Sequence, residues 1–190
     1  VAATNTLWFV GAQPSAGAAA AAAPGGTVPT DATAGSFPFA NPTGGDTQHF
    51  TLGNVLANVG GNQLLIYDRI FSVTKTMNST ATEAVTGVPT RYQNTVAGSV
   101  DSAEGNFLIM ECRTVLPATA HNWNTCLYND QANAASTLPS VTGNSPNIVN
   151  RLDMPASQWF APLAAGDTGI RSLTQMQCSA AVATGAIDFT

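Results

Sequence analysis

Residues 64–76 read LLIYDRIFSVTKT, a run rich in β-branched and aromatic side chains that predicts a long β-strand. Residues 106–115, NFLIMECRTV, have the same character. Residues 170–179, IRSLTQMQCS, predict a third strand whose successive side chains lie on opposite faces of a sheet. One of these faces would carry Ile170, Ser172, Thr174, Met176 and Cys178.

Shorter strands are predicted over 123–128, 158–163 and 186–189, and clusters of turn-forming residues separate the strands. About six to eight short strands with turns between them favour a mainly β fold, an antiparallel β-sandwich or jelly-roll-like domain. The chain shows no regular alternation of strand and helix patterns, so a parallel sheet is not expected.

Residues 1–48 differ in composition from the rest of the chain. Between residues 11 and 46 they are rich in Ala, Gly, Pro and Thr, and such a segment buries too little apolar surface to fold by itself. We therefore predict an extended arm or loop over 1–48 and a β-sandwich core over 49–190. The arm would be anchored on another chain by Leu7, Trp8 and Phe9. Alternatively, residues 7–10 are a first strand of the core, followed by a long surface loop.

One short helix is expected at the start of the core domain. Residues 52–59 carry apolar side chains at helical spacing. Thr51 is suited to cap the first turn, and the Gly60–Gly61 pair is suited to end the helix.

Charge is scarce throughout the chain. Six basic and eleven acidic residues make up 9% of the sequence, against roughly 25% in an average soluble domain. A surface of uncharged polar residues suits a protein that is packed against other protein. The basic residues are scattered singly and the net charge is −5, which argues against binding to nucleic acid or to an anionic membrane surface.

The sequence offers little that resembles a catalytic centre, and we predict that the protein is not an enzyme and holds no cofactor or metal. The two histidines are His49 and His121, and His121 lacks the close Cys or His spacing that makes a zinc site specific. Glu104 and Glu111 are candidates for a carboxylate pair, but an ion pair of Glu111 with Arg113 is the better interpretation. The three cysteines are expected to be free thiols, mostly buried.

Several of the few charges fall inside predicted strands, where an unpaired charge is costly. We therefore predict that these charges form ion pairs between strands or between subunits. The residues concerned are Asp68, Arg69, Arg91, Glu111, Arg113 and Arg171.

Three segments in this order, 65–73 (LIYDRIFSV), 87–92 (GVPTRY) and 163–172 (LAAGDTGIRS), resemble a family of virion structural proteins of tailed bacteriophages. The resemblance covers residues 49–189. It implies a capsid cement or decoration protein that bridges and stabilises neighbouring major capsid subunits. Its partners would be the major capsid protein and copies of itself, and its location the virion capsid, assembled in the host cytoplasm.

Two other functions are alternatives to this one. A phage tail or head-surface module that binds host glycans would be favoured by Trp123 or Trp159 exposed in a groove. A glycan hydrolase would need two carboxylates about 5–10 Å apart in a cleft.

Overall fold

The computed structural model describes residues 20–30, 32–33, 67–149 and 151–190. These residues contain nine strands and no helix, which confirms the mainly β fold class. No helix long and apolar enough to cross a membrane occurs among them. The predicted helix over 52–59 lies outside the described residues. The strands are β1 (Val73–Thr76), β2 (Glu83–Ala84), β3 (Met110–Thr114), β4 (Asn122–Trp123), β5 (Leu127–Asp130), β6 (Ala135–Thr137), β7 (Val141–Thr142), β8 (Ile170–Met176) and β9 (Ala186–Phe189).

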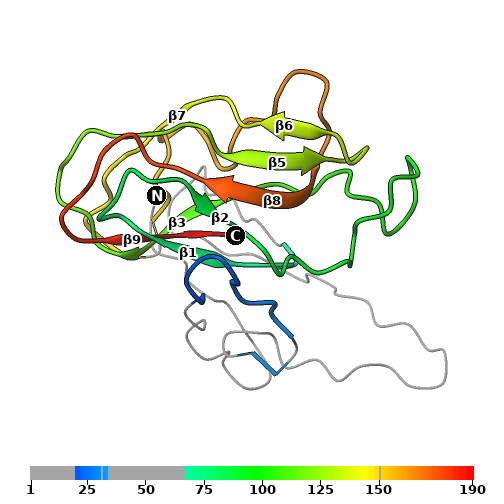
Figure 1. Ribbon diagram of the computed structural model, residues 1–190, viewed down its shortest axis with the longest axis horizontal. Helices are drawn as coiled ribbons and strands as arrows, with labels where there is room; N and C mark the ends of the chain where they lie inside the picture. Colours follow the sequence, from blue (N-terminus) through cyan, green and yellow to red (C-terminus); the bar gives the residue numbers. More distant parts are fainter. Residues whose placement is uncertain (1–19, 31, 34–66, 150) are drawn as a thin grey trace, which may run out of the picture.

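The strands form three antiparallel sheets (Figure 1). The first has the order β1-β9-β3, the second has the order β2-β8-β5-β6, and β4 pairs with β7 in a small third sheet. In Figure 1 the strands β5, β6 and β8 lie above β1, β3 and β9. The two larger sheets thus bring together segments that are far apart in the sequence.

One apolar cluster joins the two larger sheets. Val73 and Ile187 from the first sheet and Leu173 and Met176 from the second are all at most 5% exposed and belong to it. Trp123 packs edge-on against Phe189 with 4.9 Å between the ring centroids, which ties the small sheet to β9. Because both sheets turn apolar side chains toward one core, the fold is β-sandwich-like.

Strand β8 departs from the predicted alternation. Ile170, Leu173 and Met176 are buried, at a spacing of three residues, while Ser172 and Thr174 are only half-buried. The register with β5 shifts twice along this strand, leaving Arg171 and Thr174 without a partner residue on β5. Each β-bulge adds one residue and so changes which side chain turns inward. The predicted alternation therefore fails along this strand, because Leu173 is buried together with Ile170 and Met176.

Other predicted strands are shorter than expected or absent. In the described part of the 64–76 run, residues 67–76, the strand is β1, because its partner β9 ends at Phe189. The 123–128 run is split between β4 and β5 by Thr125, whose φ of 55° turns the chain. The prediction for 158–163 was wrong, since this segment begins in a turn with the Gln158 N–H bonded to the Pro155 carbonyl.

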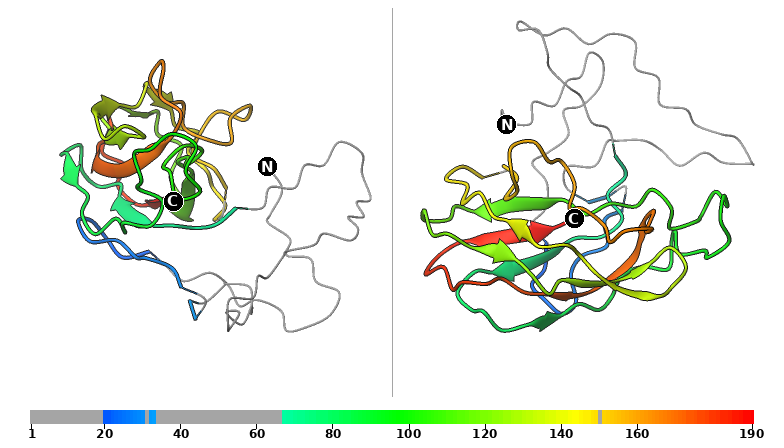
Figure 2. Two further views of the ribbon diagram at one scale, coloured as in Figure 1. Left: turned by 90° about the vertical axis from the view of Figure 1, so that its right-hand side faces the viewer. Right: turned by 90° about the horizontal axis from the view of Figure 1, so that it is seen from above.

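Residues 20–28, part of the predicted arm, lie along β1 of their own chain (Figure 2). Thr27 and Ser72 exchange two backbone hydrogen bonds of 2.7 and 2.9 Å. The Thr74 N–H donates to the Ala21 carbonyl at 2.9 Å. This segment covers an edge of the first sheet whose backbone groups would otherwise be open to pairing with another chain. Residues 7–9 lie outside the described residues.

Candidate functional site: a groove at one end of the sandwich

A groove of about 760 Å³ brings together four of the residues that the sequence predicted as interface residues: Asp68, Arg69, Arg91 and Arg171. They come from three separate stretches of the chain, namely the segment before β1, the loop between β2 and β3, and the start of β8. That loop extends away from the sheets, on the right in Figure 1. The fifth predicted residue in the described part, Arg113, does not line this groove.

The floor of the groove is apolar and its rim is polar. Phe71, Leu108 and Leu173 are buried core residues that also line the groove. Phe107 stacks on Phe160 at 4.9 Å between ring centroids and stays about half exposed. A groove of this kind can bury apolar atoms of a partner while its rim fixes the partner's orientation.

Two ion pairs lie at the rim of the groove. Asp68 pairs with Arg91 at 3.3 Å, and both side chains are about half exposed. Arg69 pairs with Glu111 at 3.7 Å, and Arg69 also donates to the Thr190 hydroxyl at 3.1 Å. Burial raises the pKa of Glu111, and the nearby Arg69 guanidinium offsets only part of this shift. Pairing predicted from the sequence thus occurs within one chain at these positions.

Arg113 and Arg171 have other partners than expected. Arg113 pairs with Asp188 on β9 at 2.8 Å rather than with Glu111. Arg171 bonds to neutral groups: its Nε donates to the Gln93 carbonyl at 2.8 Å and its guanidinium to the Asn133 side chain. Gln93 in turn donates to the Arg171 carbonyl. Within its own chain a loop amide rather than a carboxylate faces the Arg171 guanidinium, and an ion pair of Arg171 between subunits stays a prediction.

All the exposed charges in the described part of the chain gather at this groove. Asp68, Arg91 and Glu104 line it, and Asp101 lies between two lining residues, Val100 and Ser102. Every other charged side chain among the described residues is half-buried or buried. The groove therefore lies at the end of the molecule where the exposed charges are concentrated.

Exposed apolar side chains border the same groove, and the sequence patterns did not reveal them. Tyr67 and Phe107 line it with exposures of 52% and 49%. Val100 is 98% exposed and Val96, on the same loop, is 63% exposed. Such a gathering of exposed large apolar groups is typical of a surface that contacts another molecule. In contrast, Trp123 is buried in the core, and neither it nor Trp159 lines the groove.

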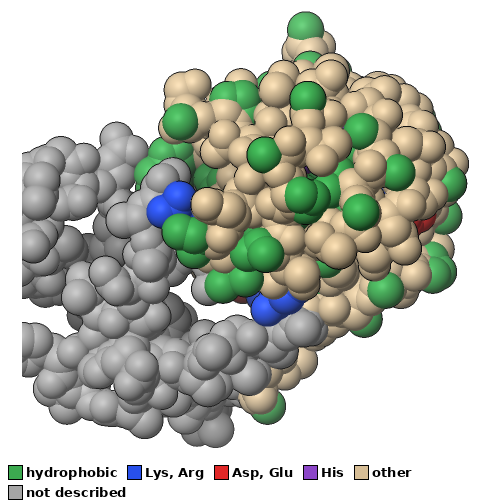
Figure 3. Space-filling model, turned by 90° about the vertical axis from the view of Figure 1, so that its left-hand side faces the viewer, with side chains coloured by type: hydrophobic (Ala, Val, Ile, Leu, Met, Phe, Trp, Pro, Cys, Tyr) green, Lys and Arg blue, Asp and Glu red, His purple; other side chains and the backbone are tan. Residues whose placement is uncertain are grey.

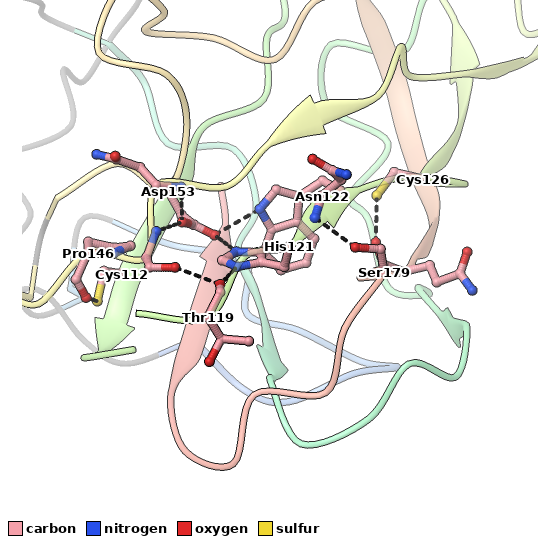
Figure 4. A network of polar contacts seen from close by, with 12 residues as sticks. Cys112, Thr119, His121, Asn122, Cys126, Pro146, Asp153 and Ser179 are labelled. Carbon is pink, nitrogen blue, oxygen red and sulfur yellow. Dashed lines mark hydrogen bonds and ion pairs between the residues drawn. The ribbon is translucent and has the colours of Figure 1, made fainter. Parts of the chain in front are cut away.

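A second polar cluster, centred on the buried side chains of His121, Trp123 and Asp153, lies beside β4 (Figure 4). The Asp153 carboxylate accepts from His121 Nε2 at 2.7 Å and from the Trp123 indole at 2.9 Å. Its other oxygen accepts from the backbone N–H groups of Asn144 and Ser145 at 2.7 and 2.9 Å. One carboxylate thereby joins three segments of the chain.

The ring of His121 is held by two acceptors. Its Nε2 faces Asp153 and its Nδ1 faces the Thr119 carbonyl at 2.8 Å, and a carbonyl can only accept. Both ring nitrogens therefore carry a proton when Asp153 is ionised, and neither is available as a general base. The Asp130 carboxylate accepts hydrogen bonds from the backbone N–H groups of Ala132 and Ala134. Within the described residues no group of His, Cys, Asp and Glu is arranged to hold a metal ion.

Stability is expected to fall as the pH rises through the folded-state pKa of His121. Burial alone lowers this pKa, but the hydrogen bonds to Asp153 and Thr119 and the charge of Asp153 together raise it above the ordinary 6.5. The stabilisation that protonated His121 gives to the folded state is complete below pH 6.5 and is lost as the imidazolium deprotonates. Denaturant unfolding at several pH values between about 6 and about 9 measures how steeply the free energy of unfolding changes with pH. The slope should persist in His49→Gln and flatten in His121→Gln; equal slopes in both variants would contradict the assignment.

The three cysteines are free and buried, as the sequence predicted. Burial raises the pKa of Cys112 and of Cys126 to about 11 and also raises that of Cys178. Because only the thiolate attacks disulfide and alkylating reagents, the native protein should not be labelled at neutral pH. Ellman's reagent should detect three thiols only after unfolding in denaturant. Rapid labelling of one thiol in the native protein would show that its site opens.

The fold and the groove define a mainly β, sandwich-like protein with a mixed charged and apolar groove at one end. No family model, curated protein or solved structure matches the chain. The resemblance to virion proteins therefore stays a prediction.

Proposed function

We propose that this chain is a structural protein of a virus particle, a capsid cement or decoration protein that bridges neighbouring major capsid subunits. The sequence resemblance suggests this class of protein. The observation that carries the proposal is the distribution of charge, because the exposed charged residues all lie at one end of the described surface and the other charged residues described are half-buried or buried.

Almost all of the carboxylates are bonded to groups of their own chain. Of the eleven acidic residues, Asp31 and Asp46 lie outside the described residues, and each of the other nine accepts a hydrogen bond or ion pair from its own chain. Viewed from the end opposite the β2–β3 loop, the surface shows few charged side chains (Figure 3). Covering such a surface with another protein requires little desolvation of charge, and the cores of protein interfaces are depleted of charge in the same way.

Three exposed apolar residues away from the groove would supply a contact for the capsid. Val115, Ile148 and Val149 are 44%, 44% and 47% exposed. A hydrogen bond of 3.0 Å from the Leu116 N–H to the Pro146 carbonyl holds their two segments together. The patch lies apart from the groove, since none of its residues lines it.

The test is binding to empty capsids of the phage that encodes the chain, assembled without it. The protein should sediment with the capsids and raise the temperature at which they disrupt. Ile148→Asp should weaken binding by at least about tenfold, because a charge would be buried in the contact. Val100→Asp, at the groove, is the matched control and should bind normally. No cosedimentation at any concentration tested would overturn the proposal.

A further inference from the structure

We propose that the groove and the loop at its rim, residues 96–100, form a self-complementary contact between two copies of this chain. Each copy would place its rim loop against the groove of the other, about a two-fold axis. This inference concerns the charged end of the molecule and does not depend on the capsid proposal.

The end of the molecule that carries the groove has both a projecting loop and a hollow. The rim loop belongs to the β2–β3 connection that extends from the sheets, and its Val100 is 98% exposed to solvent. Directly beside it lies the 760 Å³ groove with its apolar floor. A two-fold contact uses the same patch on both subunits, so it requires a surface that carries a projection and a matching hollow.

The charges are also self-complementary. Arg69, Arg91 and Arg171 line the groove, against the carboxylates of Asp68 and Glu104 and the adjacent Asp101. With Glu111, which pairs with Arg69 at the same rim, the count is three guanidinium groups and four carboxylates, so this end is nearer to neutrality than the whole chain with its net charge of −5. Two copies can therefore meet at this patch with little net repulsion.

The rim loop is held in place by its own hydrogen bonds. Asn94 donates to the Asp101 side chain at 3.0 Å, and the Gly98 N–H donates to Glu104 at 2.7 Å. The Ser102 N–H closes the turn on the Ser99 carbonyl at 3.0 Å. A loop that is already ordered loses little conformational entropy when it docks.

A second protein chain fits this surface better than a saccharide. The guanidinium and carboxylate groups at the rim are already paired with each other or with backbone groups, whereas sugar hydroxyls require free partners. Tyr67 and Phe107 offer ring faces inside the groove, but the most exposed apolar side chains, Val96 and Val100 on the rim loop, offer no flat face on which a sugar ring stacks. Burying them against an apolar floor removes them from water.

The experiment is sedimentation equilibrium of the full chain over a wide range of concentration. The wild-type protein should show a reversible dimer. Val100→Asp should weaken dimerisation by at least about a hundredfold, because it would place a charge against the apolar floor of the partner. Val100 is so exposed that the variant should keep the thermal unfolding curve of the wild type. Ile148→Asp is the matched control on the other apolar patch and should dimerise normally.

Three results would overturn the inference: a monomer at every concentration, a dimer that Val100→Asp leaves intact, or a dimer that Ile148→Asp breaks equally. Raised salt should weaken the wild-type dimer moderately, since part of the contact is ionic. The same two variants separate this inference from the capsid proposal. Val100→Asp should lose dimerisation and keep capsid binding, and Ile148→Asp should do the reverse.

Discussion

Replacing Asp153 by alanine should lower the free energy of unfolding by about 3–5 kcal/mol, the usual cost of breaking a buried ion pair. The carboxylate is completely buried and accepts four hydrogen bonds. Without it the buried imidazolium of His121, the Trp123 indole and two backbone N–H groups lose their acceptor. His121 would then deprotonate, which recovers only part of the loss.

Urea unfolding monitored by Trp fluorescence and by circular dichroism would measure this change. The matched control is Asp101→Ala, which removes an exposed carboxylate bonded to Asn94. It should cost less than about 1 kcal/mol. If the two variants were equally stable, the buried network would not contribute to holding its three segments together.

A second large loss, about 3 kcal/mol, is expected for Glu83→Ala. Lys75 on β1 is fully buried, and its ammonium group lies 2.5 Å from the Glu83 carboxylate on β2. This pair connects the first sheet to the second. Removing Glu83 leaves a cation in the core without a counter-ion.

The double variant Lys75→Met, Glu83→Ala separates charge from packing. Methionine fills a similar volume without a charge, so the double variant should regain most of the stability lost by Glu83→Ala. The exposed pair of Asp68 and Arg91 provides the comparison, and Asp68→Ala should change stability by less than about 1 kcal/mol. Equal destabilisation in the single and the double variant would assign the loss to packing instead of charge.

Local composition was enough to predict strands where the chain is apolar and has a partner along its whole length. The 186–189 strand was predicted with its correct bounds. The burial pattern of β8 was not predictable, because its two bulges are set by the register with β5. The two-residue strands β2, β4 and β7 carry no periodic signal. Trp159 and Phe160 gave the 158–163 run the composition of a strand, but its residues pack as a loop.

Scarcity of charge predicted that Asp68, Arg69, Glu111 and Arg113 would be paired, and the structure pairs all four. The partners were predictable only in part, since Asp188 reaches Arg113 through the sheet and not through the sequence. The groove could not be predicted, because it exists only where topology brings three distant stretches together. Its exposed aromatic residues looked like core residues in the sequence.

The position of β9 has a consequence for biosynthesis. The strand at 186–189 lies between β1 and β3, which are not paired with each other. During translation the edges of β1 and β3 that pair with β9 therefore stay unpaired until the segment more than a hundred residues beyond β1 has been made. Contacts so distant in sequence fold slowly, and open edges can pair with other nascent chains. The first sheet of this protein should therefore form only after synthesis has passed residue 189. Ribosome-bound chains that stop before residue 186 should be sensitive to protease.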